Sequence, residues 1–436
     1  MKFVSTRGGR TASFDEALVK GIAGDGGLFV PALWPAFRLD DFAAASSIQG
    51  VARVFLSPFF DGSKLEADLP EIVAETFSFP IPAAELPVSP GRACLLELFH
   101  GPTAAFKDVG AAFLASCLSR LEGDTDRPLT ILVATSGDTG GAVAAAFDRR
   151  PGMRVVVLFP QGRVSARQEK QLTCWSDNVL SLSVNGSFDD CQSLVKAAMA
   201  DRTLNQQHRF SSANSINIGR LLPQCCYYAD ASLRHFRDTC RKPSFIVPTG
   251  NLGNGLACIL AREAGLPVGR IILACNANRL IADYLGGAEW LPRASVRTLA
   301  SAMDVGFPSN MERLINLHGE ADILKTLVSV TNVDDDAIRE QIRKDFRRFG
   351  FAVCPHTATA TYAYDQLADS ERTDDDWILA ATAHPAKFDD IVEPLIGTEI
   401  PVPGPLASIL SRPSSVSSIS PDLKSLSAAL TNRFAA

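Results

Sequence analysis

From about residue 90 onward, short apolar runs alternate with helical patterns along the chain. The runs LTILVAT (129–135), RVVVLFP (154–160), NVLSLSV (178–184), PSFIVPT (243–249), RIILACN (270–276) and WILAATA (377–383) are predicted strands. Predicted helices lie between them at 142–147, about 188–200 and 253–264. Strands built almost wholly from Val, Ile and Leu, and separated by helices, are typical of parallel sheets covered on both faces. The pattern therefore predicts an α/β fold.

The two ends of the chain lack this alternation. Residues 1–85 carry fewer apolar runs and many turn-forming residues, including GDGG (24–27), and we predict a mainly helical N-terminal region there. The tail from 401 to 436 is rich in Ser and Pro, and we expect it to be loosely held, with a short helix at its end. The acidic clusters at 334–336 and 374–376 each precede an element, which favours caps or turns over a chemical role.

Composition and charge exclude several classes of protein. The formal net charge is −6 over 436 residues, without a basic stripe, so we expect no binding to nucleic acid or to anionic membranes. The sequence contains no run of about 18 apolar residues, so no membrane span is predicted, and the N-terminus does not resemble a secretory signal. The 10 Cys form no C-x-x-C motif, which favours reduced, buried thiols and a cytoplasmic location.

One lysine stands at the start of a predicted helix, in ELFHGPTAAFKDVGAAFLASCL (97–118). The buried stripe of this helix is predicted to be Phe106, Val109, Gly110 and Phe113. Lys107 lies at the edge of that stripe. Two interpretations are open: its side chain extends to water, or it is an amine whose pKa is lowered by a partly apolar pocket and which forms a Schiff base.

Two segments rich in Gly, Ser, Thr and Asn each lie between a predicted strand and a helix. TSGDTGG (135–141) is compatible with an ordinary capped helix, with Asp138 or Thr139 as the cap, or with an anion site at the helix N-terminus. PTGNLGNG (248–255) lets backbone approach a ligand closely. It is not G-x-G-x-x-G, and no acidic residue follows at the spacing that a ribose requires, so NAD is disfavoured and a phosphate-sized anion is favoured.

A further segment, TAHPAKF (382–388), follows the last predicted strand. Thr382 could place a hydroxyl in the same crevice, whereas His384 and Lys387 are interpreted as loop residues without a chemical task. His100 and His356 have no partner at metal-ligand spacing, so a metal enzyme is rejected. The absence of G-x-S-x-G also argues against a Ser-His-Asp hydrolase.

Taken together, these motifs resemble the threonine synthase family. FHGPTAAFKD, TSGDTGGAVAAAF, SSANSINIGRLLPQ (211–224), PTGNLGNG, AMDVGFPSNMERL (302–314) and TAHPAKF occur in the order and spacing of that family, and the opening STRGG with GIAGDGGLFVP (21–31) is similar too. The resemblance runs from about residue 1 to 398. It implies the pyridoxal-phosphate fold of type II, related to the tryptophan synthase β subunit, with two parallel-sheet α/β domains.

On this resemblance the chain divides into five segments. The N-terminal region is residues 1–85, and the tail is residues 401–436. The large cofactor-binding domain combines residues 86–129 with 236–400, and the small α/β domain is residues 130–235. Closure of the small domain against the rest is expected, because reactive intermediates must be kept from water.

The resemblance also implies roles for individual residues. Lys107 would hold pyridoxal 5'-phosphate as a Schiff base, and Thr382 would face the pyridine nitrogen. The cofactor phosphate would be bound by Gly250, Asn251, Leu252, Gly253 and Asn254. The substrate carboxylate and the cofactor ring oxygen would be surrounded by Thr135, Ser136, Asp138 and Thr139. Candidates for the substrate phosphate are Lys170, Asn217 and Arg220. The protonation state of Asp138 is open, because an ionised carboxylate beside the ring oxygen is a like-charge contact.

The implied reaction converts O-phospho-L-homoserine and water to L-threonine and phosphate, with the cofactor as electron sink. Phe307 and Arg279 stand where the family usually has Asn and an acidic residue. The alternative is therefore a lyase of the same fold that releases phosphate and a 2-oxo acid from a phosphorylated amino acid. A third possibility is a binding protein that keeps the fold but has no catalytic activity. The intact Lys107 argues against it. The expected partner is a small-molecule substrate, and the expected state a monomer or homodimer.

Overall fold

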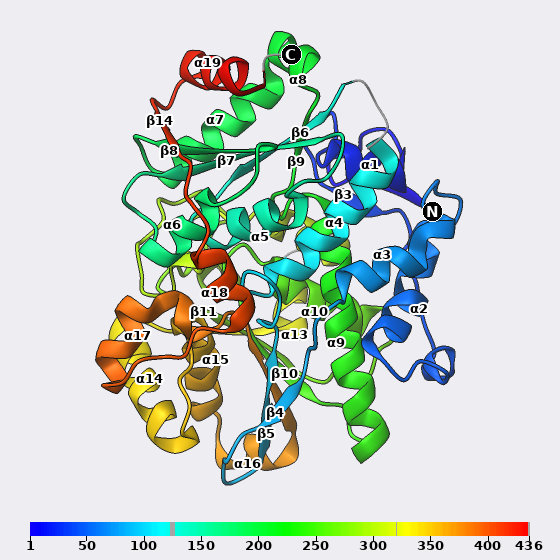
Figure 1. Ribbon diagram of the computed structural model, residues 1–436. Coiled ribbons are helices and arrows are strands. Elements are labelled where there is room, and N and C mark those ends of the chain that lie inside the picture. Colours follow the sequence, from blue (N-terminus) through cyan, green and yellow to red (C-terminus); the bar gives the residue numbers. More distant parts are fainter. Residues whose placement is uncertain (123–126, 320, 435–436) are drawn as a thin grey trace.

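The computed structural model describes residues 1–122, 127–319 and 321–434. In these parts the chain forms two mainly parallel sheets with helices on both faces, and a small antiparallel sheet near the N-terminus (Figure 1). The α/β fold predicted from the alternating apolar runs is confirmed.

The larger sheet has six strands in the order β12-β11-β10-β13-β5-β4. Its strands are β4 (Ala83–Glu85), β5 (Arg92–Glu97), β10 (Ser244–Pro248), β11 (Ile271–Cys275), β12 (Ser329–Asn332) and β13 (Asp376–Ala381). All pairings are parallel except that of β4 with β5. The predicted strands at 243–249, 270–276 and 377–383 become β10, β11 and β13, and every residue of these three strands is buried.

Alternate residues of the larger sheet enter two separate cores, because successive side chains of a strand point to opposite faces. One row crosses four neighbouring strands through Leu95, Leu379, Ile246 and Ile272. Helix α15 (Pro355–Asp365) covers this face, and α14 (Asp335–Phe349) packs on α15. As predicted for the first acidic cluster, Asp334 caps α14 by accepting from the Ala337 N–H.

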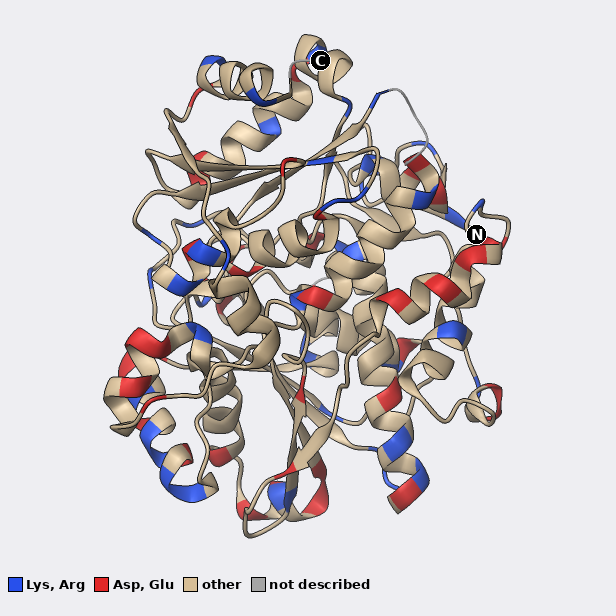
Figure 2. Ribbon diagram, viewed as in Figure 1, with Lys and Arg blue, Asp and Glu red and all other residues tan. Residues whose placement is uncertain are grey.

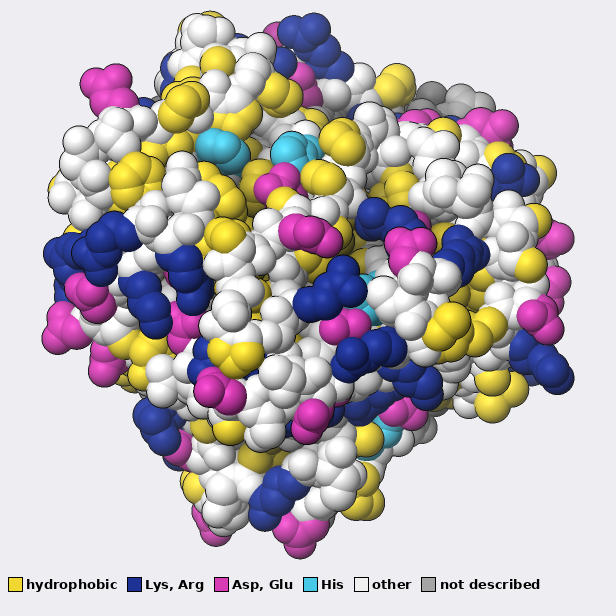
Figure 3. All heavy atoms as spheres, turned by 90° about the horizontal axis from the view of Figure 1, so that it is seen from below, with side chains coloured by type: hydrophobic (Ala, Val, Ile, Leu, Met, Phe, Trp, Pro, Cys, Tyr) yellow, Lys and Arg dark blue, Asp and Glu magenta, His cyan; other side chains and the backbone are white. Residues whose placement is uncertain are grey.

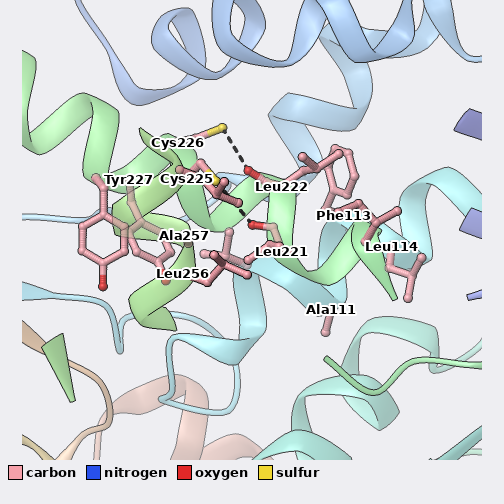
Figure 4. Close-up of a cluster of buried hydrophobic side chains, with 14 of the residues drawn as sticks. Ala111, Phe113, Leu114, Leu221, Leu222, Cys225, Cys226, Tyr227, Leu256 and Ala257 are labelled. Carbon is pink, nitrogen blue, oxygen red and sulfur yellow. Dashed lines mark hydrogen bonds between the residues drawn. The ribbon is translucent and has the colours of Figure 1, made fainter. Parts of the chain in front are cut away.

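The opposite face of the larger sheet enters a core to which four long helices contribute. They are α2 (Ile48–Phe60), α4 (Lys107–Glu122), α9 (Ile218–Thr239) and α10 (Gly253–Glu263). Figure 4 shows where α4, α9 and α10 meet: Phe113, Leu222 and Leu256 lie in one buried cluster. The Cys225 and Cys226 thiols donate to the carbonyls of Leu221 and Leu222 within α9, at 3.8 and 3.9 Å, so these cysteines are packing residues.

The smaller sheet has five strands, all parallel, in the order β14-β8-β7-β6-β9. They are β6 (Leu129–Ala134), β7 (Met153–Pro160), β8 (Val179–Val184), β9 (Phe210–Ser212) and β14 (Ser417–Ile419). In Figure 1 the sheet lies between α7 (Phe188–Ala200), α8 (Arg202–His208) and α19 (Leu423–Phe434) above, and α5 (Asp138–Phe147) and α6 (Ala166–Thr173) below. The predicted strands at 129–135, 154–160 and 178–184 are confirmed.

The expectation of a loosely held tail is wrong. After α18 (Gly404–Leu410), strand β14 adds to the edge of the smaller sheet by pairing in parallel with β8. Helix α19 then buries Leu426 and Leu430 fully against that sheet. The Ser-rich composition concealed a stripe of leucines spaced for one face of a helix.

The N-terminal region and one domain boundary add detail to the predictions from the sequence. The N-terminal region contains α1 (Phe14–Lys20), α2 and α3 (Leu69–Thr76), as predicted, but also an antiparallel sheet of β1 (Lys2–Ser5), β2 (Ala12–Ser13) and β3 (Phe29–Pro31). The boundary expected at residue 235 lies inside α9, which packs on α4 and α10. We therefore propose that the smaller unit ends before α9.

The remaining helices complete the periphery of the molecule. They are α11 (Leu280–Leu285), α12 (Met311–His318), α13 (Ala321–Leu327), α16 (Asp369–Asp374) and α17 (Asp389–Ile396). Figure 2 shows charged residues concentrated on outer helices such as α14 and α17, while the sheet strands are mainly uncharged. On the face seen in Figure 3, Lys and Arg are interspersed with Asp and Glu. Among the described residues, no helix has both the length and the apolar character needed to cross a bilayer.

Candidate active site

The carboxyl ends of both parallel sheets open onto one cavity of about 620 Å³. The segments that follow β5, β6, β10 and β13 all contribute to its wall, because parallel strands end at the same edge of a sheet. The sequence-predicted residues that line it are Lys107, Thr135, Ser136, Asp138, Thr139, Arg220, Gly250, Asn251, Gly253, Asn254 and Thr382. The fold thus assembles most of the candidate residues around a single space.

Lys107 is the first residue of α4, and the pairing of the preceding segment with the end of β13 fixes its position. The Phe106 N–H donates to the Thr382 carbonyl at 2.9 Å, and Ala105 forms a β-bridge with Ala383. The Lys107 side chain is only 14% exposed. Burial lowers the pKa of its ammonium, against the opposing effect of Asp138. Of the two interpretations left open by the sequence, the structure supports an amine in a partly apolar pocket.

Asp138, in the first turn of α5, is a buried carboxylate between two lysines. Its Oδ2 lies 3.7 Å from the Lys107 Nζ, and its Oδ1 lies 2.9 Å from the Lys387 Nζ. Burial alone would raise the pKa of this carboxyl, but Lys387 and Lys107 outweigh burial and lower it. Its two lysine neighbours therefore favour the ionised form of Asp138.

The interpretation of Lys387 as a loop residue without a chemical task is not supported. It lies in the short 3-10 helix η4 (Pro385–Phe388), and its side chain is buried. Its ammonium donates to the Thr103 carbonyl at 2.7 Å and to Asp138. The only signal in the sequence was its place in TAHPAKF, directly after a buried strand.

The loop between β10 and α10 holds an unusual backbone conformation. Leu252 has φ 61°, in the left-handed region, and its side chain is fully buried, so only its backbone is available to a ligand. A Cβ on Gly250 would lie 2.5 Å from the Cα of Met303, which no side chain tolerates. The loop ends at the N-terminus of α10, where the first backbone N–H groups of a helix have no internal partner and favour an anion.

The two asparagines of this loop build it through their side chains. The Asn251 amide donates to the Ser215 hydroxyl at 2.6 Å and its oxygen accepts from the Ser309 N–H at 2.5 Å. Asn254 accepts from the hydroxyls of Tyr227 and Tyr228, at 2.8 and 2.7 Å. Because these amides are already engaged, the loop offers an anion mainly its backbone N–H groups.

In the loop between β6 and α5, the Thr135 hydroxyl is also engaged. It accepts from the N–H groups of Gly137, which is the N-cap of α5, and of Gly140, at 3.0 and 2.9 Å. Neither Asp138 nor Thr139, the caps that the sequence left possible, caps this helix. Ser136 and Thr139 line the cavity beside Thr135. These two hydroxyls are therefore the better candidates for contact with a ligand.

Arg220, in the first turn of α9, is a buried cation on the cavity wall. It is 2% exposed, and one guanidinium nitrogen donates to the Ala213 carbonyl at 2.6 Å. Its Nε has no hydrogen-bond partner among the described residues. Burial lowers the pKa of Arg220 to about 10. A buried guanidinium with unused donors is suited to an anionic ligand.

The other two candidates for the substrate phosphate, Asn217 and Lys170, do not line the cavity. Asn217 is the N-cap of α9: its oxygen accepts from the Gly219 N–H, and its amide donates to the carbonyls of Leu18 and Ser212. Lys170 donates to the Ser414 hydroxyl at 3.0 Å, toward the C-terminal segment. The structure therefore does not place either residue at the cavity, and their contact with the substrate phosphate stays a prediction.

Among the lining residues that sequence reasoning missed are His356 and Thr249. His356, which the sequence analysis considered only as a metal ligand, lies in the first turn of α15 and accepts from the Ala302 N–H at 3.0 Å. Burial lowers its pKa to about 4, so the imidazole is neutral at neutral pH. The Thr249 hydroxyl is buried in the wall and has no partner among the described residues. Its place in PTGNLGNG was a usable signal.

Of the two residues that depart from the family pattern, one lines the cavity and the other does not. Phe307 lines the cavity, is 43% exposed and contacts the Trp290 ring at a centroid distance of 5.4 Å. Arg279 precedes α11 and pairs with Asp283 at 3.5 Å, outside the residues that line the cavity. Only Phe307 is therefore placed to influence what the site accepts.

Comparisons with known proteins agree along the whole chain. A family model described as pyridoxal-phosphate dependent enzyme matches residues 82–382. Models described as threonine synthase N terminus and threonine synthase, C-terminal match residues 2–77 and 357–430.

Individual relatives give the same result. The chain is 38% identical to the threonine synthase of Escherichia coli, over 92% of both chains. The crystal structure of that enzyme superimposes with a TM-score of 0.90, over 99% of this chain and 100% of the other, at 36% identity. The crystal structure of PLP-bound threonine synthase from Brucella melitensis superimposes with a TM-score of 0.91, at 33% identity and with 100% of both chains covered.

Proposed function

The chain belongs to the threonine synthase family of pyridoxal-phosphate-dependent enzymes, and from this premise we propose that it converts O-phospho-L-homoserine and water to L-threonine and phosphate. The observation that carries the proposal is that one cavity is lined by a buried lysine amine, the N-terminus of α10 and a second, separate cation at Arg220. Such a site can accept two phosphate groups, one from the cofactor and one from the substrate.

The residues of the cavity fit the cofactor, pyridoxal phosphate. Lys107 would hold its aldehyde covalently, and the backbone of Gly250–Asn254, with the unpartnered Thr249 hydroxyl, would bind its phosphate. Thr382, at the end of β13, would face the pyridine nitrogen with a neutral hydroxyl. When bound, the cofactor withdraws electrons from the substrate α-carbon and so eases proton loss there.

Arg220 is the proposed partner of the substrate phosphate. Phosphate leaves from the γ-carbon as an anion, and a buried guanidinium with unused donors stabilises charge that develops there. Ser136 and Thr139 are the proposed donors to the substrate carboxylate, since they line the cavity beside the first turn of α5.

Lys107 is the proposed carrier of protons. Its amine, displaced by the amine of the substrate, accepts the α-proton and then moves protons between neighbouring carbons as general base and acid. Water adds at the β-carbon after phosphate has left, and a final protonation completes threonine. The low exposure of Lys107 restricts the access of other water to these steps.

We also propose that the enzyme works in the cytoplasm, as a monomer or homodimer. All ten cysteines are free thiols and most are buried, which suits a reducing compartment.

The first experiment is incubation of the purified protein with O-phosphohomoserine. We expect threonine and phosphate in equal amounts, and we expect Lys107→Ala to lose the visible absorbance of bound cofactor and to slow the reaction by at least about 100-fold. Release of phosphate with 2-oxobutyrate in place of threonine would assign the chain to the lyase alternative. Absence of phosphate release from the wild-type protein would refute the proposed function.

A further inference from the structure

A second buried lysine lies beside the proposed catalytic lysine. Lys387 comes from η4, after β13, whereas Lys107 begins α4, after the segment that pairs with the end of β13. The Lys387 side chain is 1% exposed. It is not a cavity-lining residue and therefore reaches the site only through its neighbours.

The Asp138 carboxylate connects the two lysines, but unequally. The contact with Lys387, at 2.9 Å, has the length of a charge-assisted hydrogen bond, whereas the contact with Lys107, at 3.7 Å, is too long for one. The Gln168 amide also donates to Asp138 Oδ1, at 3.3 Å. Asp138 is therefore the ion-pair partner of Lys387 and only a neighbour of Lys107.

This inequality matters for the charge of Lys107. A carboxylate beside an amine favours the ammonium form, whereas a second cation beside it favours the neutral form. The charged and titratable groups around Lys107 are Asp138 from α5, Lys387 from η4, Arg220 from α9 and the neutral His356 from α15. Asp138 therefore favours the ammonium form, whereas Lys387 and Arg220 favour the neutral amine, and burial, which has the largest effect, lowers the pKa of Lys107.

We propose that Lys387 is a positioning residue that holds Asp138 as its own ion-pair partner and so keeps Lys107 available as a free amine. The inference rests on the proposed function, because only the neutral amine attacks an aldehyde or accepts a proton. Asp138 in turn stays directed at the cavity, where its Oδ2 is left for the cofactor or substrate.

The test measures how fast pyridoxal phosphate attaches to Lys107 at different pH values. The full-length protein is stripped of cofactor and mixed with pyridoxal phosphate, the attachment is fixed by borohydride, and the Lys107 peptide is quantified by mass spectrometry. In Lys387→Gln, which keeps a polar but uncharged side chain, Asp138 loses its cationic partner. We expect the pH midpoint of attachment to rise by about one unit, which is a roughly tenfold slower attachment at neutral pH.

Three further variants separate this role from a merely structural one. Lys387→Arg keeps the positive charge and should keep the wild-type midpoint. The double variant Lys387→Gln with Asp138→Asn removes the carboxylate as well and should bring the midpoint back to the wild-type value or below. Lys344→Gln removes a lysine that pairs with the buried Asp365 at 2.8 Å, remote from the cavity, and should leave the midpoint unchanged.

An unchanged midpoint in Lys387→Gln, with thermal unfolding like that of Lys344→Gln, would overturn the inference and leave the proposed function intact. If Lys387→Gln does not fold, Lys387→Met replaces it, and we expect the same rise in the pH midpoint. The double variant measures the midpoint in the absence of both charges. Failure of the wild-type protein to attach pyridoxal phosphate at Lys107 at any pH would instead refute the proposed function.

Discussion

At the scale of single residues, the site separates groups that meet a ligand from groups that hold others in place. Thr135, Asn217, Asn251 and Asn254 use their side chains to bind backbone or neighbouring side chains. Arg220 differs, since it lines the cavity and its buried Nε has no hydrogen-bond partner among the described residues. Residue type alone does not distinguish these roles, because an amide or hydroxyl is suited to both.

The contrast between Arg220 and Lys170 gives a prediction. Replacing Arg220 by Met should lower kcat/KM for O-phosphohomoserine by about 10- to 100-fold, because a hydrogen bond to a charged phosphate contributes about 1.5–3 kcal/mol. Lys170→Met removes a cation of α6 that contacts Ser414 and does not line the cavity, and should leave kcat/KM within about twofold of the wild type. Equal losses in both variants would indicate that Lys170 also contacts the substrate phosphate. The values of kcat/KM are measured by steady-state kinetics, with phosphate release as the signal.

At the scale of elements, the site depends on where loops touch. The β10–α10 loop lies against the segment at 302–307, and Gly250 is the closest point. Gly250→Ala should destabilise the cofactor-free protein by about 1–3 kcal/mol, since its Cβ would meet backbone at 2.5 Å.

Gly253 provides the matched control within the same loop. Its Cβ would lie 3.5 Å from the Asn310 amide, an ordinary contact, so Gly253→Ala should change the stability by less than about 0.5 kcal/mol. Urea denaturation of both variants without cofactor makes the comparison. Similar stabilities for the two variants would show that the loop relaxes away from Met303.

The C-terminal helix gives a second prediction at this scale. Leu426→Ala in α19 should destabilise the protein by about 2–5 kcal/mol, because the side chain is fully buried against the smaller sheet. Leu33→Ala is the matched substitution at a side chain that is 78% exposed, and should cost less than about 0.5 kcal/mol. A Leu426→Ala variant as stable as Leu33→Ala would restore the expectation of a loosely held tail. Chemical denaturation followed by circular dichroism measures both.

At the scale of the whole molecule, the cavity is lined by elements that belong to both parallel sheets. Its wall combines the loops of the larger sheet with α5 and with Phe188, Asp189 and Gln192 of α7, which cover the smaller sheet. A neighbouring open space of about 1630 Å³ lies between α7, α8 and the N-terminal region, and shares Asn214, Asn251 and Phe307 with the cavity. The structure therefore leaves room for the smaller unit to approach the rest.

We expect the smaller unit to close when substrate binds, because phosphate loss requires a site shielded from bulk water. Crystal structures of the holoenzyme with and without a phosphonate analogue of the substrate should show the smaller sheet and α7 displaced toward the N-terminal region. Identical positions in the two structures would contradict this expectation.

The sequence alone was sufficient for the architecture and for the chemistry of the main motifs. Buried parallel strands are nearly continuous runs of Val, Ile and Leu, and this local signal located β6, β7, β8, β10, β11 and β13. The motifs around Asp138, Gly250 and Thr382 each follow a predicted strand, but only the tertiary structure shows that they come from two sheets whose carboxyl ends open onto one cavity. The short strands β1, β2 and β14 were not predictable, because a few residues paired with distant partners leave no periodic signal.

Tertiary structure alone decided which polar groups are free and which are paired. Asn217 became a helix cap, Lys170 turned toward the tail, and Lys387 became the partner of Asp138. The charge states of Asp138, Lys107 and His356 follow from burial and from neighbours that are distant along the chain. A sequence records which ionisable groups are present. Their solvation and the distances between them, which set their pKa values, arise only when the chain is folded.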